Sequence, residues 1–237
     1  MINVLGVHHL GLTVADLDAS RTFYEAGGYT VTDRLRADGP DAALGNGLPR
    51  AALDIVFADG PTAGGPGTGS PGLILELVRF DPPGERRVTA VDPAFGTVPL
   101  WSADSAGTDP DGRPVTAAGP GAVQVTLTTA DPVGTARLLR LLGFEGAGRG
   151  GAADTTGLTG HGLDLALRRV PEPPVPPGPN DAGRTHLCCR VTDMTAAVAA
   201  LDEAGFGTVS TPRVHGDLQW VFVRHPEGPG VELLCLT

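Results

Sequence analysis

Apolar and polar residues alternate with a period of two in three separate stretches of the chain, and apolar positions at helical spacing follow each stretch. The alternation predicts half-buried β-strands, and the later spacing, as at Val198 and Leu201, predicts amphipathic helices. An aspartate begins each predicted helix, where its side chain can accept hydrogen bonds from free backbone amides. A glycine followed by an aromatic residue ends each helix and favours a left-handed turn there.

The three stretches share one spacing, which indicates an internal repeat. Seven residues separate a strand position from the aspartate, and twelve more separate the aspartate from the glycine. The equivalent residues are His9, Asp16 and Gly28 in the first copy, Gln124, Asp131 and Gly143 in the second, and His186, Asp193 and Gly205 in the last. Short strand-like runs follow each helix, such as LILELVRF in the first copy and GVELLCL in the last. The repeated unit is therefore predicted to be β-α-β-β-β, and the fold class α+β.

The repeat divides the chain into units. The predicted units are residues 1–80 for the first βαβββ module, 81–118 for a truncated, degenerate module or linker, 119–170 for the second full module and 184–237 for the last module, with 170–183 as a proline-rich spacer. The truncated stretch is too long for a plain connection and has no helical pattern. It places Thr97 and Thr116 at positions equivalent to those of the full units. The spacer is predicted to be semi-rigid and polyproline-like.

Composition and charge limit the class of partner. The 35 glycines and 22 prolines in 237 residues favour short strands and many turns over long helices. A formal net charge of −10 repels phosphate backbones and anionic lipid surfaces, so neither nucleic acid nor membrane is an expected partner. The first residues lack a basic region ahead of an apolar run, and we expect a cytoplasmic protein without a signal peptide. Three cysteines, Cys188, Cys189 and Cys235, are expected to be buried thiols.

These features resemble the vicinal oxygen chelate superfamily, which includes glyoxalase I, methylmalonyl-CoA epimerase, extradiol dioxygenases and the bleomycin and fosfomycin resistance proteins. The strand histidine, the Asp-capped helix that ends in glycine and an aromatic residue, and the final HPEGPGVELL run carry the resemblance. It implies repeated βαβββ modules that pair into cup-shaped mixed sheets. It also implies that first-strand and last-strand side chains of two modules hold one divalent metal ion. It leaves the reaction open, because one fold hosts many activities.

Carried onto this sequence, the resemblance implies four metal ligands. They are His9 and Glu76 in the first unit, and His186 and Glu232 in the last. Two histidines and two carboxylates suit Zn, Ni, Co, Mn or Fe and leave two positions for water or substrate oxygens. The four converge on one centre if the first unit pairs with the last. Sequential pairing would instead divide them between two sites, with Gln124 as a weak ligand beside His186 and Glu232.

Several neighbouring residues take secondary roles in this interpretation. Because side chains alternate along a strand, His8 faces away when His9 faces the cup. In the second unit either Asp164 or Ala166 stands where the glutamate belongs, depending on the register. Cys188 shares the face of His186, and His215 stands where a substrate-facing acid or base can lie.

Three functions remain open from the sequence. The first is a glyoxalase-type isomerase, epimerase or lyase that acts on a small oxygenated substrate, with Glu76 or Glu232 as the base. The second is an Fe(II)-dependent extradiol-type dioxygenase that uses His9, His186 and Glu232 as its triad and His215 as acid–base partner. The third is a non-catalytic protein that sequesters a cationic drug or toxin and so confers antibiotic resistance. All four ligands lie in one chain, so a monomer would suffice, and a homodimer is equally compatible.

Overall fold

The computed structural model describes residues 2–61, 72–100, 107–117, 123–147, 154–173 and 175–236. Residues 101–106 and 118 of the expected truncated unit lie outside these ranges. The elements in chain order are β1 (Val4–Thr13), α1 (Leu17–Ala26), β2 (Thr30–Ala37), α2 (Pro40–Gly45), β3 (Ala52–Asp59), β4 (Ile74–Asp81), β5 (Val98–Leu100), β6 (Gly107–Thr108), β7 (Pro114–Ala117), β8 (Val123–Thr129), α3 (Pro132–Leu141), β9 (Glu145–Gly146), β10 (Thr155–Gly160), β11 (Leu163–Arg169), β12 (Thr185–Val191), α4 (Met194–Glu203), β13 (Arg213–His215), β14 (Leu218–Val223) and β15 (Gly230–Leu236).

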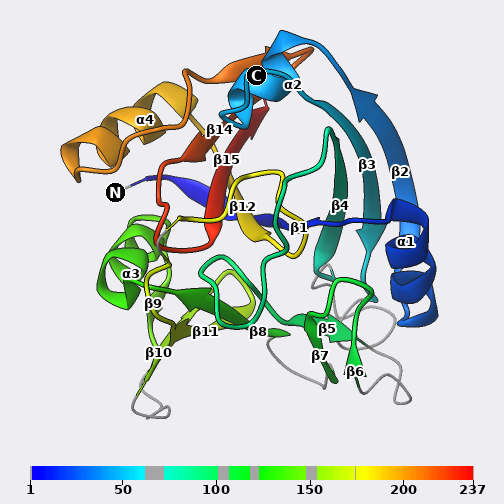
Figure 1. Ribbon diagram of the computed structural model, residues 1–237. Coiled ribbons are helices and arrows are strands. Elements are labelled where there is room, and N and C mark those ends of the chain that lie inside the picture. Colours follow the sequence, from blue (N-terminus) through cyan, green and yellow to red (C-terminus); the bar gives the residue numbers. More distant parts are fainter. Residues whose placement is uncertain are drawn as a thin grey trace.

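The first and last units share one large sheet. Its eight strands run in the order β13-β14-β15-β12-β1-β4-β3-β2. The first strands of the two units, β1 and β12, pair antiparallel at the centre, and each also pairs in parallel with the last strand of its own unit. The sheet curls so that β2, β3 and β4 lie on one side of the central pair and β14 and β15 on the other, with α2 near the top of the view (Figure 1). The chain therefore has the first-to-last pairing, and the sequential alternative is wrong.

The middle of the chain forms two smaller sheets. One has the order β8-β11-β10-β9 and the other β5-β7-β6. The two meet where the Thr97 amide donates to the Thr126 carbonyl oxygen at 2.9 Å, so the truncated unit lies beside the second full unit. The described part of residues 81–118 contains no helix, as the sequence predicts. These elements fall inside the predicted ranges 81–118 and 119–170, a division that stays a prediction.

The helix ends follow the repeat. Asp16, Asp131 and Asp193 each accept a hydrogen bond at 2.9–3.0 Å from an amide in the first turn of α1, α3 and α4, respectively. The glycines that close the three helices, Gly28, Gly143 and Gly205, have φ values of 98°, 84° and 80°. A side chain would be strained in that conformation, so glycine is required there. The predicted caps are confirmed.

A buried arginine joins the truncated unit to the large sheet. Arg113 is fully buried and binds Asp109 at 2.7 Å, and Asp109 also accepts a 2.6 Å hydrogen bond from the Tyr24 hydroxyl of α1. Nη2 of Arg113 donates to the carbonyl oxygens of Thr13 and Arg184. Those two residues lie at the end of β1 and just before β12, so this network fixes the strands that carry the histidines.

The three cysteines are buried free thiols, as the sequence predicts. No helix among the described residues has both the length and the apolar character needed to cross a bilayer.

Candidate metal centre

Four side chains meet at the centre of the large sheet, one from each of β1, β4, β12 and β15. They are His9, Glu76, His186 and Glu232. The two halves have the same register, because Glu76 pairs with the residue two positions after His9, and Glu232 with the residue two positions after His186. A strand places alternate side chains on one face, so each glutamate lies beside its histidine on the concave face. The site is thus built from two equivalent halves.

The donor atoms lie close to one another. The Nε2 atoms of His9 and His186 are 3.2 Å apart. From His9 Nε2 the distances are 3.4 Å to a Glu76 oxygen and 3.2 Å to a Glu232 oxygen. From His186 Nε2 the corresponding distances are 3.2 Å and 3.5 Å. All four donor atoms lie within 4.8 Å of one another, and all four residues are buried.

This spacing fits a bound divalent ion. Two ligand atoms at about 2.1 Å from one ion, separated by about 90–110° around it, lie about 3.0–3.5 Å apart. The five measured distances fall in or at the edge of that range. Two imidazoles and two carboxylates are also a donor set that Zn, Ni, Co, Mn and Fe accept. The residues present therefore fit the ion that the sequence implies, and their role as its ligands stays a prediction.

The four groups shift each other's protonation. Burial alone would raise the carboxyl pKa values, but His9 and His186 hold the pKa of Glu76 and that of Glu232 below their usual range. Burial opposes charge on the imidazoles, yet Cys188 and Glu76 raise the pKa of His9 well above its usual value. The carboxylates likewise raise the pKa of His186. The cluster therefore concentrates negative charge around the two imidazoles, as a cation site does.

Two neighbours orient the histidine rings. The Nδ1 atoms of His8 and His9 are 2.8 Å apart, a hydrogen bond that leaves Nε2 of His9 directed at the centre. An ideal Cβ built on Gly11 would lie 1.8 Å from Cε1 of His186. The His186 ring thus occupies space that only a glycine at position 11 provides. Cys188 pairs with His9 across the strands and is fully buried beside it.

A cavity of about 600 Å³ opens over the centre. Its walls are mainly apolar and include three aromatic side chains. Phe57 lies edge-on to His9 with ring centroids 5.8 Å apart, and Phe222 lies edge-on to His186 at 5.1 Å. Trp220 packs on Gly45 of α2, where an ideal Cβ would lie 2.0 Å from the indole. The cavity has room for a substrate with an apolar body beside the polar centre.

Arg184 and His215 also line this cavity, at different depths. His215 is exposed on β13 and is not part of the four-residue cluster, so the structure brings it to the cavity but not to the centre. Arg184 precedes His186 by two residues and is half-buried. Burial lowers the pKa of Arg184 to about 10, although Asp181 opposes the shift, so the guanidinium remains charged at neutral pH.

The inner pair of units lacks an equivalent donor set. Gln124 pairs with Asp164, so the residue in register with the glutamates of the other units is Ala166. In the truncated unit Pro99 pairs with Thr116, which leaves Thr97 and Thr116 at the equivalent positions. Among the described residues, the possible metal-binding groups all contain His9 and lie in the large sheet.

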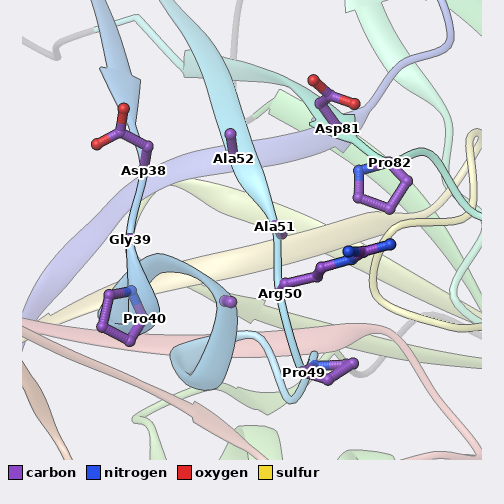
Figure 2. A pocket seen from close by; sticks show the side chains of 10 residues that line it. Asp38, Gly39, Pro40, Pro49, Arg50, Ala51, Ala52, Asp81 and Pro82 are labelled. Atoms are coloured by element: carbon purple, nitrogen blue, oxygen red, sulfur yellow. The ribbon is translucent and has the colours of Figure 1, made fainter.

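A second hollow of about 440 Å³ lies beside α2. Figure 2 shows Arg50 extending toward Pro82, with Asp38 on the opposite side of the hollow. The remaining lining consists mainly of alanine, proline and glycine. It contains no cluster of metal-type donors among the described residues, so the first cavity is the candidate site.

Sequence reasoning missed two residues of the site. Arg184 immediately precedes β12, two residues before His186, so extending the strand alternation by one residue would have found it. Gly11 could not be found in this way, because its role depends on lying opposite His186 in the β1–β12 pair.

Comparisons with known proteins agree with the fold described above. The sequence profile of the family described as "Glyoxalase/Bleomycin resistance protein/Dioxygenase superfamily" matches residues 6–233. A Bacillus subtilis structure described as a "putative dioxygenase" has a TM-score of 0.63 at 14% identity, covering 99% of this chain and 86% of its own. Glyoxalase I from Zea mays has a TM-score of 0.62 at 16% identity, covering 99% of this chain and 92% of its own. These two likenesses show the fold. No curated protein matches the sequence.

Proposed function

Because this chain belongs to the glyoxalase, bleomycin resistance protein and dioxygenase superfamily, we propose that it is a divalent-metal-dependent isomerase, epimerase or lyase. Its substrate is a small molecule with two neighbouring oxygens. The observation that carries the proposal is the convergence of four donor side chains beneath a cavity of about 600 Å³. All four donor residues belong to one chain, so a monomer is sufficient for activity. We place the protein in the cytoplasm.

The chemistry follows from the donor set. When bound, a divalent ion polarises two neighbouring substrate oxygens and makes the adjacent C–H bond acidic. His9 and His186 would hold the ion through Nε2, and the hydrogen bond from His8 to Nδ1 of His9 orients the His9 ring. Glu76 or Glu232 then accepts the proton, because both carboxylates are kept ionised and face the cavity. The apolar walls exclude water from the acidic carbon.

The geometry favours this reaction over oxygen chemistry. A dioxygenase triad of His9, His186 and Glu232 needs only one carboxylate. Glu76 stands as close to the histidines as Glu232 does, so it provides either a fourth ligand or a base. A binder of cationic drugs has no need of a buried four-donor cluster.

Solvent exchange tests the proposal. We expect the zinc-loaded protein to introduce deuterium from D₂O beside the carbonyl of at least one 2-hydroxy-carbonyl or 1,2-dicarbonyl compound in a panel, measured by NMR. Removal of the base, in Glu76→Gln or Glu232→Gln, should slow the exchange about 100-fold or more. Glu203→Gln, on the exposed end of α4, is the control and should leave the rate unchanged. Metal content measured on the same samples separates loss of a ligand from loss of a base.

Two results would contradict the proposal. Oxygen consumption by the iron-loaded protein with no exchange would establish the dioxygenase. Binding of cationic compounds with neither exchange nor oxygen consumption would establish the sequestering protein.

A further inference from the structure

One charged group that is not exposed at the rim of the cavity is not a predicted ligand of the ion. The charged residues that line the cavity are Arg36, Asp38, Asp41, Glu76, Arg184 and Glu232. At the rim, Arg36 binds Asp54 at 2.8 Å and Asp41 binds Arg213 at 3.1 Å. Deep in the cavity, the charges of Glu76 and Glu232 balance that of a divalent ion. Asp38 is exposed, so Arg184 is the half-buried charge that remains.

The guanidinium of Arg184 has few partners. Its Nη1 atom donates a hydrogen bond to the Pro177 carbonyl oxygen at 3.2 Å. Among the described residues, no carboxylate lies within 4.0 Å of it. Asp181 is the acidic residue that influences it, but its oxygens accept hydrogen bonds from the amides of Gly178 and Arg86. A half-buried charge without a close counter-ion loses part of its hydration, and a ligand that supplies a counter-ion binds favourably.

The position of this group relates it to the centre. An ideal Cβ on Gly230 would lie 3.7 Å from Nη2 of Arg184 and 2.7 Å from Cβ of His186. Gly230 also pairs with His186 across β15 and β12. The guanidinium is therefore beside the strand position from which His186 projects, and it lines the same cavity.

We propose that Arg184 binds a carboxylate of the substrate, which places the substrate among monoanions with an apolar, aromatic-sized body. This inference rests on the proposed function and specifies its substrate class. A single guanidinium suits one carboxylate, whereas the wall around it is apolar and offers little to a phosphate dianion. The apolar body then lies against Phe57, Phe222 and Trp220.

A matched pair of probes tests the proposal. Phenylpyruvate and 1-phenyl-1,2-propanedione both carry a phenyl ring and two neighbouring oxygens, but only the first has a carboxylate. We expect the zinc-loaded protein to bind phenylpyruvate at least about tenfold more tightly by calorimetry. Arg184→Met should remove that preference and change the affinity for the dione less than about threefold. Arg184→Lys should retain part of the preference, because it keeps the charge.

Arg190→Met is the matched control, because Arg190 is on β12, the strand that Arg184 immediately precedes, but does not line the cavity. It should leave both affinities unchanged. Equal affinity of the native protein for the two probes, failure to bind either, or equal loss of both in Arg184→Met would overturn the proposal. Circular dichroism of each variant verifies that it is folded.

The same titrations on metal-free protein separate the two proposals. A preference for phenylpyruvate that persists without metal and disappears in Arg184→Met supports the anion site even if the chain binds no ion. Stoichiometric metal binding with no preference between the probes retains the metal centre and rejects the role of Arg184.

Discussion

The Gly11→Ala substitution is expected to lower the zinc affinity of the protein at least about 100-fold. The new Cβ would lie 1.8 Å from Cε1 and 2.1 Å from Nε2 of His186, so the ring must leave its position. Gly11 is on β1 at the middle of the large sheet, where the backbone cannot move without disturbing both neighbouring strands. A ligand displaced by an ångström or more no longer completes the donor set. Competition with a chromophoric chelator measures the affinity.

Gly146→Ala is the control for that experiment. Gly146 is also in a strand, and an added Cβ there would meet no atom within 4 Å. Zinc affinity should be unchanged in this variant. A Gly11→Ala protein that is folded and binds zinc as tightly as the native protein would show that the His186 position is not needed for binding.

Metal affinity is expected to rise steeply with pH between about 6 and 8. In the metal-free protein, the carboxylates raise the pKa of His186, and Cys188 together with Glu76 raises that of His9 despite burial. An entering ion must displace these protons. Each displaced proton changes the affinity about tenfold per pH unit as long as the pH is below the raised pKa. Zinc titrations in buffers of different ionisation enthalpy count the protons released.

The stability of the metal-free protein should have the opposite dependence. A histidine with a raised pKa stabilises the fold fully below its unfolded pKa, and this contribution is lost as the pH rises through the folded value. The lowered pKa values of Glu76 and Glu232 act in the acid range, where stability is lost as the pH falls. Urea unfolding should therefore show the metal-free protein less stable at pH 8.5 than at pH 6.5.

For the metal-affinity prediction, zinc affinity that is the same at pH 6 and pH 8 would contradict the proton displacement.

The local features of the fold could be predicted from the sequence because they depend on near neighbours. The capping aspartates, such as Asp131, and the closing glycines, such as Gly143, act within one turn of a helix. The strand histidines followed from the repeat, because equivalent positions in equivalent units have the same orientation. That argument selected His9 rather than His8, and the structure places His9 in the four-residue cluster.

The long-range features could not be obtained in this way. Which units pair depends on the sheet edges that meet in the folded chain, and the spacing inside each unit is the same for either pairing. The sequence leaves the register of the second unit open between Asp164 and Ala166, and the pairing of β8 with β11 decides it. The requirement for glycine at position 11 likewise arises only when β12 lies across β1.

The metal content of the purified protein tests the central claim most directly. Elemental analysis should find about one divalent ion per chain in the native protein and none above background in His9→Ala and His186→Ala. Loss in both variants is required, because the two histidines come from opposite ends of the chain and serve one centre. No bound ion under any loading condition, or full occupancy in either variant, would contradict the account.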